Sequence, residues 1–113
     1  MPSLFLNETC LIPDLQVADT FAARALGLMG HKGMPHGHGL LIQPCRSIHT
    51  WFMRFPLDVI FLDKNWRVVK VGPNLKPWRL AWGGWNAVAV VEVRSGWLPP
   101  LQPGSTLRVE YTA

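Results

Sequence analysis

Proline and glycine divide this chain of 113 residues into short apolar runs, and that division constrains its fold more than any other feature. There are ten residues of each type, with no internal repeat and no linker-like stretch. Together they stay below the roughly 25–30% that is typical of disordered chains. We therefore expect a single domain over residues 1–113, large enough to fold without a metal or a disulfide.

Most of these runs have the composition of β-strands. Residues 87–93 are short, β-branched and apolar on both faces, which predicts the most central strand. Residues 63–66 separate two β-branched runs and predict a hairpin turn. The other predicted strands are residues 40–45, residues 48–62 with a break at Pro56, residues 67–71 and residues 106–111.

One segment near the N-terminus predicts a helix. Phe21, Ala25 and Leu28 recur at spacings of three and four, Asp19 can cap the first turn and Gly30 can end the last one. We therefore expect a mainly β (α+β) fold, a small barrel-like domain of five or six short strands with one short helix. Parallel βαβ units are excluded because they need a helix between strands.

Charge and targeting signals narrow the class of protein. The net charge of +4, from 11 basic and 7 acidic residues, is too modest to require a polyanionic partner. No apolar run could span a bilayer, and residues 1–8 lack the regions of a signal peptide. We expect a soluble, cytoplasmic protein with no membrane association, in which Cys10 and Cys45 are thiols.

Three charged residues among apolar neighbours form the candidate site: Arg54, Asp58 and Glu92. Glu92 stands between Val91 and Val93. A buried carboxylate without a partner costs several kcal/mol or takes up a proton, so we expect Glu92 to pair, with Arg54 as the obvious partner. The cluster is either a structural network or one end of a pocket that holds a small polar or anionic ligand, or a protein partner.

Strand alternation places aromatic residues beside this cluster. On a strand through residues 49–55, His49 and Trp51 share one face, and Phe52 and Arg54 share the other. Four residues of straight strand span roughly 13 Å, so Arg54 meets Asp58 only if the chain bends at Pro56. The candidate ligand-binding residues are Arg54, Asp58, Glu92, Trp51, Phe52 and His49.

The sequence contains no nucleophile–base motif, which favours a non-enzymatic binding domain. Two alternatives remain. Asp58 and Glu92 are a possible acid–base pair for a small hydrolase, although nothing in their spacing selects that chemistry. Residues 64–85 contain five cations, four of the six Trp and no acid, a composition that occurs in single-strand nucleic-acid surfaces as well as in a solvated hairpin with buried indoles. Within them, the indoles around Gly83 and Gly84 form a candidate partner-binding loop.

The histidines do not predict a metal site. His31, His36, His38, Cys45 and His49 lie within 19 residues, but their spacing matches no recognised zinc pattern. Several glycines surround His36 and His38, which indicates a solvated loop in which only His49 is packed. We expect no metal and no cofactor.

Several blocks of sequence resemble one known family. They are residues 24–29, residues 39–41, residues 91–93, Gly96 and above all residues 53–63, Met-Arg-Phe-Pro-Leu-Asp-Val-Ile-Phe-Leu-Asp. Together they are similar to the bacterial and archaeal family called domain of unknown function 192, or uncharacterised protein family 0127, over residues 15 to 110. The resemblance implies a small, mainly β single domain and brings no established activity. Matching positions are Arg24, Gly27, Met29, Met53, Arg54, Pro56, Asp58 and Glu92, whereas Trp66 stands where relatives usually have a turn glycine.

Overall fold

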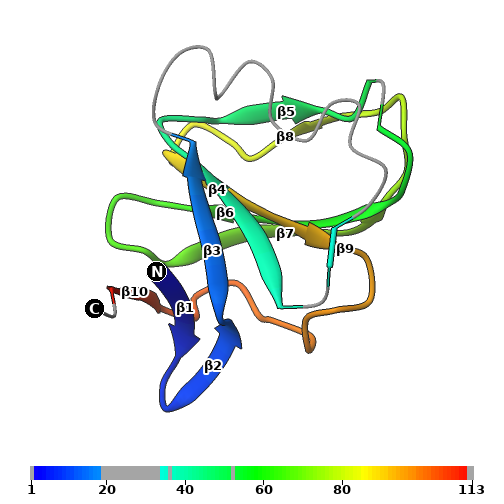
Figure 1. Ribbon diagram of the computed structural model, residues 1–113. Helices are drawn as coiled ribbons and strands as arrows, with labels where there is room; N and C mark the ends of the chain where they lie inside the picture. The colour runs from blue at the N-terminus through cyan, green and yellow to red at the C-terminus, as the bar shows by residue number, and fades with distance from the viewer. Residues whose placement is uncertain (1, 19–33, 36, 52, 112–113) are drawn as a thin grey trace.

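The computed structural model describes residues 2–18, 34–35, 37–51 and 53–111, which are coloured in Figure 1. These ranges form ten strands and no helix. The expected helix over residues 21–29 lies outside the described residues. The strands are β1 (Pro2–Leu6), β2 (Thr9–Ile12), β3 (Asp14–Ala18), β4 (His38–Ile42), β5 (Ser47–His49), β6 (Leu57–Leu62), β7 (Val68–Leu75), β8 (Leu80–Trp82), β9 (Ala89–Arg94) and β10 (Leu107–Tyr111).

A five-stranded sheet in the order β3-β4-β9-β6-β7 forms the centre of the molecule. β9 is its middle strand and pairs antiparallel with β4 and β6, which confirms the prediction of the most central strand. β3 pairs with β4 in parallel. Two smaller sheets, β10-β1-β2 and β5-β8, lie on opposite sides of the central sheet (Figure 1). We call the side that carries β5 and β8 the upper face, and the side toward β1, β2 and β10 the lower face.

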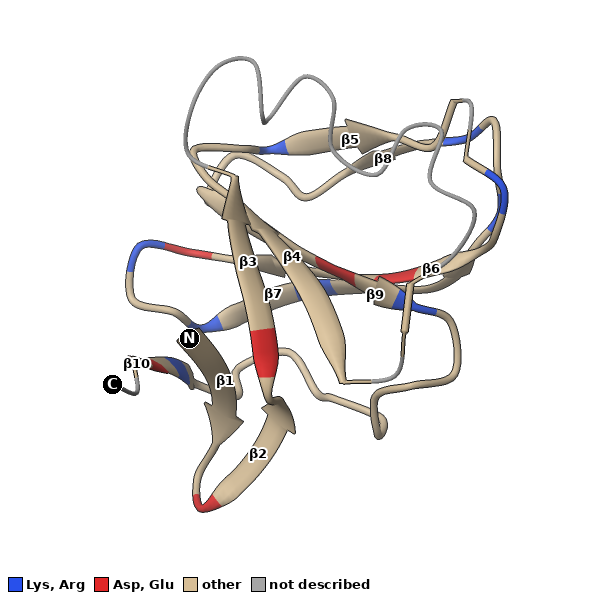
Figure 2. Cartoon of the chain, viewed as in Figure 1, with Lys and Arg blue, Asp and Glu red and all other residues tan. Residues whose placement is uncertain are grey.

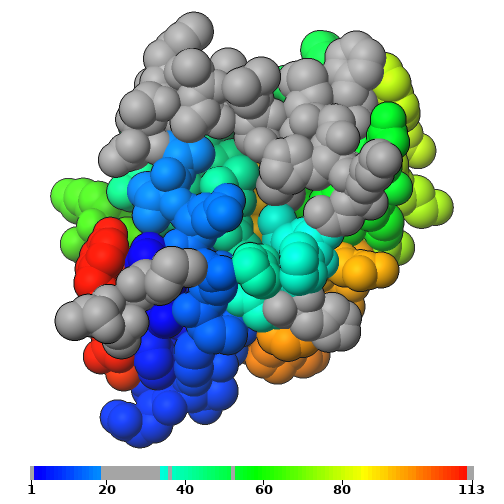
Figure 3. Space-filling model, viewed as in Figure 1, coloured from blue at the N-terminus to red at the C-terminus, as the bar shows by residue number. Residues whose placement is uncertain are grey.

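Each face of the central sheet has its own hydrophobic core, because successive strand residues point to opposite faces. Val91 and Val93 of β9 belong to the lower core with Leu4 of β1. Val90 belongs to the upper core with Ile48 of β5. At the edge of the lower face, β1 pairs with β10, so the two ends of the chain lie side by side in blue and red (Figure 3).

The predicted barrel-like α+β fold is wrong. The described strands form three separate sheets, and the outer edges of β3 and β7 pair with no further strand in those ranges, so no barrel closes. The prediction assigned no strand to residues 2–18, which form three. It also missed β8, which is three residues long, because so short an element gives no measurable alternation.

The predicted hairpin at residues 63–66 is confirmed, since these residues join β6 to β7. Trp66 adopts a φ of 62°, a conformation that is costly for a bulky residue. Oδ1 of Asp63 accepts hydrogen bonds from the backbone N–H groups of Asn65 and Arg67, and Trp66 packs against the lower core. These contacts hold a turn that a glycine would form without strain. The Arg67 N–H bond is also the main reason that the pKa of Asp63 is lowered.

The β5-β8 sheet lies close against the upper face at Gly83, the residue after β8. A Cβ at Gly83 would overlap the ring of Phe61 from β6 and would lie 2.9 Å from Cβ of Ala87. The backbone N–H of Gly83 donates to the carbonyl oxygen of Arg46, at 2.7 Å. Only a residue without a side chain fits this approach.

Candidate functional site

Glu92 lies at the centre of the central sheet, on its upper face. It stands opposite Leu40 of β4 and Val59 of β6 and is only 4% exposed. Both neighbours are apolar, and burial raises the pKa of the Glu92 carboxyl from 4.5 to about 7. Near neutral pH this group therefore exists partly as the protonated acid, which is the form that an apolar environment favours.

Asp58 lies one register step away but on the lower face, where it shares its side of β6 with Ile60. Its Oδ1 accepts hydrogen bonds from the backbone N–H of Asn74, at 2.8 Å, and from the Ser95 hydroxyl, at 3.4 Å. Its Oδ2 accepts one from the backbone N–H of Gly96, at 2.9 Å. We call this arrangement the Asp58 clamp, because one carboxylate joins β6 to the end of β7 and to the turn after β9.

Arg54 meets neither carboxylate. The two ion pairs recorded among the described residues are His38–Asp14 and Arg108–Glu110, so Arg54 takes part in neither, and it is exposed. The prediction treated residues 49–55 as one strand, whereas β5 ends at His49. The Met53 N–H then donates to the Thr50 carbonyl oxygen, at 3.2 Å, which marks a turn. Strand alternation does not apply across such a turn, so it does not determine the side on which Arg54 lies.

The aromatic candidates also separate. His49 and Trp51 stay together, with ring centroids 4.8 Å apart, but Trp51 is exposed. Nδ1 of His49 is buried without a hydrogen-bond partner among the described residues. Phe52 lies outside the described residues.

The three charged candidates therefore form no common cluster. The backbone of the central sheet separates Asp58 from Glu92, so the two carboxylates cannot flank one scissile bond as a two-carboxyl hydrolysis requires. The described residues likewise contain no group of three or more His, Cys, Asp or Glu side chains placed to hold a metal.

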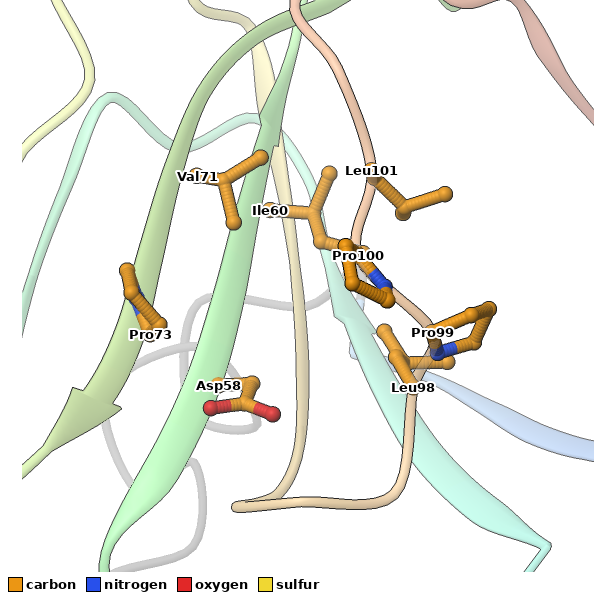
Figure 4. A pocket seen from close by; sticks show the side chains of 8 residues that line it. All are labelled: Asp58, Ile60, Val71, Pro73, Leu98, Pro99, Pro100 and Leu101. Atoms are coloured by element: carbon orange, nitrogen blue, oxygen red, sulfur yellow. The ribbon is translucent and has the colours of Figure 1, made fainter.

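A cleft opens beside the Asp58 clamp on the lower face. Its volume is about 400 Å³. One wall is formed by Ile60 of β6 with Val71 and Pro73 of β7, and the other by residues 98–101, whose sequence is Leu-Pro-Pro-Leu (Figure 4). Figure 4 shows the Asp58 carboxylate at one end of an otherwise apolar lining. The sequence prediction missed residues 98–101, because an apolar run that contains two prolines gives no strand or helix signal.

The sequence prediction also missed a contact between His38 and Asp14. His38, which was expected in a solvated loop, is the first residue of β4, and its Nδ1 lies 3.2 Å from Oδ2 of Asp14 on β3. The parallel pairing of β3 with β4 brings them together. The only signal in the sequence was that His38 directly precedes an apolar run.

The two cysteines are thiols. Cys10 is exposed on β2, and Sγ of Cys45 donates to the Ser47 carbonyl oxygen, at 3.0 Å, so the two thiols do not form a disulfide with each other. Within the described ranges, no helix has the length and apolar character that crossing a membrane demands.

The fold of this chain is similar to that of two proteins of known structure. Two crystal structures share its fold: a protein of unknown function from Novosphingobium aromaticivorans, with a TM-score of 0.79, and a protein from Sinorhizobium meliloti described as "a putative transcription regulator", with a TM-score of 0.74. They are 22% and 20% identical to this chain; the matches cover 97% and 84% of this chain and 83% and 80% of theirs.

Sequence relatives point to the same group. A UPF0127 protein of Pyrococcus horikoshii is 47% identical over 72 residues, and one of Pyrococcus furiosus is 41% identical over 71 residues. These matches cover 59% and 58% of this chain and span 60% and 59% of the length of those relatives. The model of the DUF192 family, described as uncharacterised, matches residues 5–109. The chain therefore belongs to the DUF192 family of uncharacterised proteins, as its motif at residues 53–63 predicted.

Proposed function

We propose that this protein is a non-enzymatic binding domain that takes a small, largely apolar amine into the cleft beside the Asp58 clamp. The observation that carries the proposal is the composition of the cleft, in which one carboxylate stands at the end of an apolar wall. Concave sites with mostly apolar lining and few polar groups are the usual form of small-molecule sites. The sequence had favoured a small polar or anionic ligand held by Arg54, but the charge at this cleft is negative.

The hydrogen bonding of Asp58 supports a ligand that donates protons. Each carboxylate oxygen can accept more than one hydrogen bond. Oδ2 accepts only the Gly96 N–H among the described residues, so it retains acceptor capacity. An ammonium group there gains a charge-assisted hydrogen bond, while its alkyl chain displaces water from beside Val71 and Leu98.

The walls support binding without large rearrangement. Pro99 and Pro100 have fixed φ angles, so the wall that they form loses little conformational freedom when a ligand packs on it. The opposite wall belongs to β6 and β7, which pair with each other and are joined near the cleft by the hydrogen bond from the Asn74 N–H to Asp58. Both walls are therefore largely formed before the ligand arrives.

The test compares three probes of equal length: hexylamine, hexan-1-ol and hexanoate. We expect hexylamine to raise the melting temperature and to shift the methyl NMR signals of Ile60, Val71, Leu98 and Leu101, hexanol to act more weakly, and hexanoate not to bind. A Val71→Phe variant fills the cleft and should weaken hexylamine binding by about tenfold or more, which corresponds to about 1.4 kcal/mol.

Val88→Phe is the matched control, because Val88 is exposed and does not line this cleft. It adds the same bulk and should leave hexylamine binding unchanged. Equal shifts with hexanoate, or undiminished binding to a folded Val71→Phe variant, contradict the proposal.

A further inference from the structure

Exposed indoles gather over the outer side of the β5-β8 sheet, away from the cleft. Trp51, Trp78, Trp82 and Trp85 are 43%, 57%, 48% and 76% exposed, and Leu80 is 72% exposed. We call these five residues the indole surface. Large apolar side chains left in water add little to the stability of the monomer, and a gathered set of them indicates a surface that binds something else.

The strand register arranges this surface in a row. Leu80 and Trp82 alternate along β8, and His49 on β5 lies opposite Leu80. Beyond His49 comes the ring of Trp51, at a centroid distance of 4.8 Å, and beyond Trp82 comes Trp85, edge to face at 5.2 Å. Alternate residues of a strand stand about 6.6 Å apart. Two ring pairs, His49–Trp51 and Trp82–Trp85, therefore lie toward opposite ends of the β5-β8 sheet, with Leu80 between them.

Trp78 is held in a strained conformation at the start of this row. Its φ is 64°, which is costly for a bulky side chain. The buried Thr50 fixes it: the Trp78 N–H donates to the Thr50 carbonyl oxygen, at 3.0 Å, and the Arg79 N–H donates to the Thr50 hydroxyl, at 2.8 Å. That hydroxyl in turn donates to the Lys76 carbonyl oxygen, at 2.6 Å. Three hydrogen bonds thus hold an indole where it is more than half exposed.

Cations are fixed beside the same indoles. Lys70 donates from Nζ to the carbonyl oxygen of Trp82, at 2.8 Å, and Arg79 donates from Nη1 to the carbonyl oxygen of Trp78, at 3.4 Å. Residues 43–57 and 64–85, which contain both strands of this sheet, include no Asp or Glu. Figure 2 shows blue and no red on β5, β8 and the adjoining coloured loops.

From this juxtaposition we propose that the indole surface binds single-stranded nucleic acid. Unpaired bases stack on the indole rings, and the phosphates between them contact Lys70 and Arg79. Base stacking on aromatic side chains above a basic groove is how proteins bind single strands without sequence preference. The site is independent of the cleft, which lies on the lower face.

The row of rings favours a nucleic acid over an acidic protein. Cations alone serve an acidic peptide, which gives no reason to keep four indoles exposed beside them. A double helix is disfavoured because its bases are already stacked inside, whereas an extended single strand offers one flat ring per residue along its length.

The experiment measures the anisotropy of a short fluorescein-labelled oligothymidylate titrated with the whole chain at several salt concentrations. We expect binding at low salt that weakens steeply as salt rises, because counterions return to the phosphates. Trp78→Ala and Trp82→Ala should each weaken binding by about tenfold or more at constant salt, since one stacked base contributes about 1–3 kcal/mol. Lys70→Gln should reduce the salt dependence, with a smaller loss of affinity.

Matched controls lie on β10. Tyr111→Ala removes an exposed aromatic residue and Arg108→Gln removes an exposed cation, and neither should change binding. Melting temperatures confirm that each variant is folded. No binding at low salt, equal binding of the Trp variants, or full competition by polyglutamate at matched charge overturns the proposal; the last two outcomes indicate a polyanion or acidic-protein surface without stacking.

Discussion

Asp58 and Glu92 lie on adjacent strands of the same sheet, one register step apart, and face opposite sides. Asp58 accepts hydrogen bonds from two backbone N–H groups and a hydroxyl. Glu92 is surrounded by apolar cross-strand neighbours, and its pKa is raised to about 7. Two carboxylates so close in the fold thus differ in their effect on stability: Asp58 joins three segments through its hydrogen bonds, whereas burial penalises Glu92 for carrying a charge.

The sharpest test of this contrast removes the Asp58 clamp. Asp58→Ala leaves the N–H groups of Asn74 and Gly96 without their acceptor, and hydrogen bonds to a charged group contribute about 1.5–3 kcal/mol each. Both N–H groups belong to exposed residues and can bond to water instead, so the lower figure applies to each, and we expect the free energy of unfolding to fall by about 3 kcal/mol in urea titrations. Glu110→Ala, at an exposed carboxylate, should change it by less than about 0.5 kcal/mol. A loss at Asp58 no larger than that control would show that the clamp is not a stabilising element.

Glu92→Gln should instead raise the free energy of unfolding at alkaline pH. The folded state binds a proton up to a pKa of about 7, while the unfolded state releases it near 4.5. Stability contributed by the bound proton is fully present below pH 4.5 and is lost as pH rises to about 7. At pH 8 the amide should therefore be more stable than the native protein by about 3 kcal/mol, and at pH 4 the difference should vanish. Unfolding by urea at pH 4, 6 and 8 measures this, and a difference that does not change with pH contradicts it.

The segments that pack on the two faces also differ in how closely they approach the central sheet: residues 98–101 on the lower face and the β5-β8 sheet on the upper face. On the lower face a cleft remains, whereas on the upper face Gly83 touches Phe61. Gly83→Ala should destabilise the fold by about 2 kcal/mol through overpacking, measured by thermal and urea unfolding. Gly84→Ala is the comparison for backbone strain alone, because a Cβ there meets no atom within 4 Å and any loss of stability comes from its φ of 99°. If Phe61→Leu fails to relieve the cost at Gly83, the overlap is not its cause.

The sequence predicted local structure better than spatial relations. Residues 87–93 were recognised as the central strand because they are apolar on both faces, and residues 63–66 as a turn from their composition. Alternation also correctly paired Asp58 with Ile60, and Glu92 with Val90. These are relations within one strand, where the period of two applies directly.

Relations between strands could not be predicted in this way. Whether Asp58 and Glu92 share a face depends on the register of β6 against β9, which one sequence does not contain. The single strand assumed over residues 49–55 was wrong, because β5 ends at His49 and the Met53 N–H donates back to the Thr50 carbonyl oxygen. The cleft needed the position of residues 98–101, which is set by packing rather than by any periodic pattern.

The Asp58 clamp ties together parts of the chain that are synthesised far apart, since Asp58 and Gly96 are 38 positions distant in sequence. Both Asp58 and Gly96 must therefore have left the ribosome before the Asp58 clamp can form. Contacts between distant segments form slowly, because the intervening loop must first close. A fragment that stops before Gly96 lacks one of the three ties and the whole proline wall, so the hollow beside Asp58 is a property of the completed chain and not of any hairpin within it.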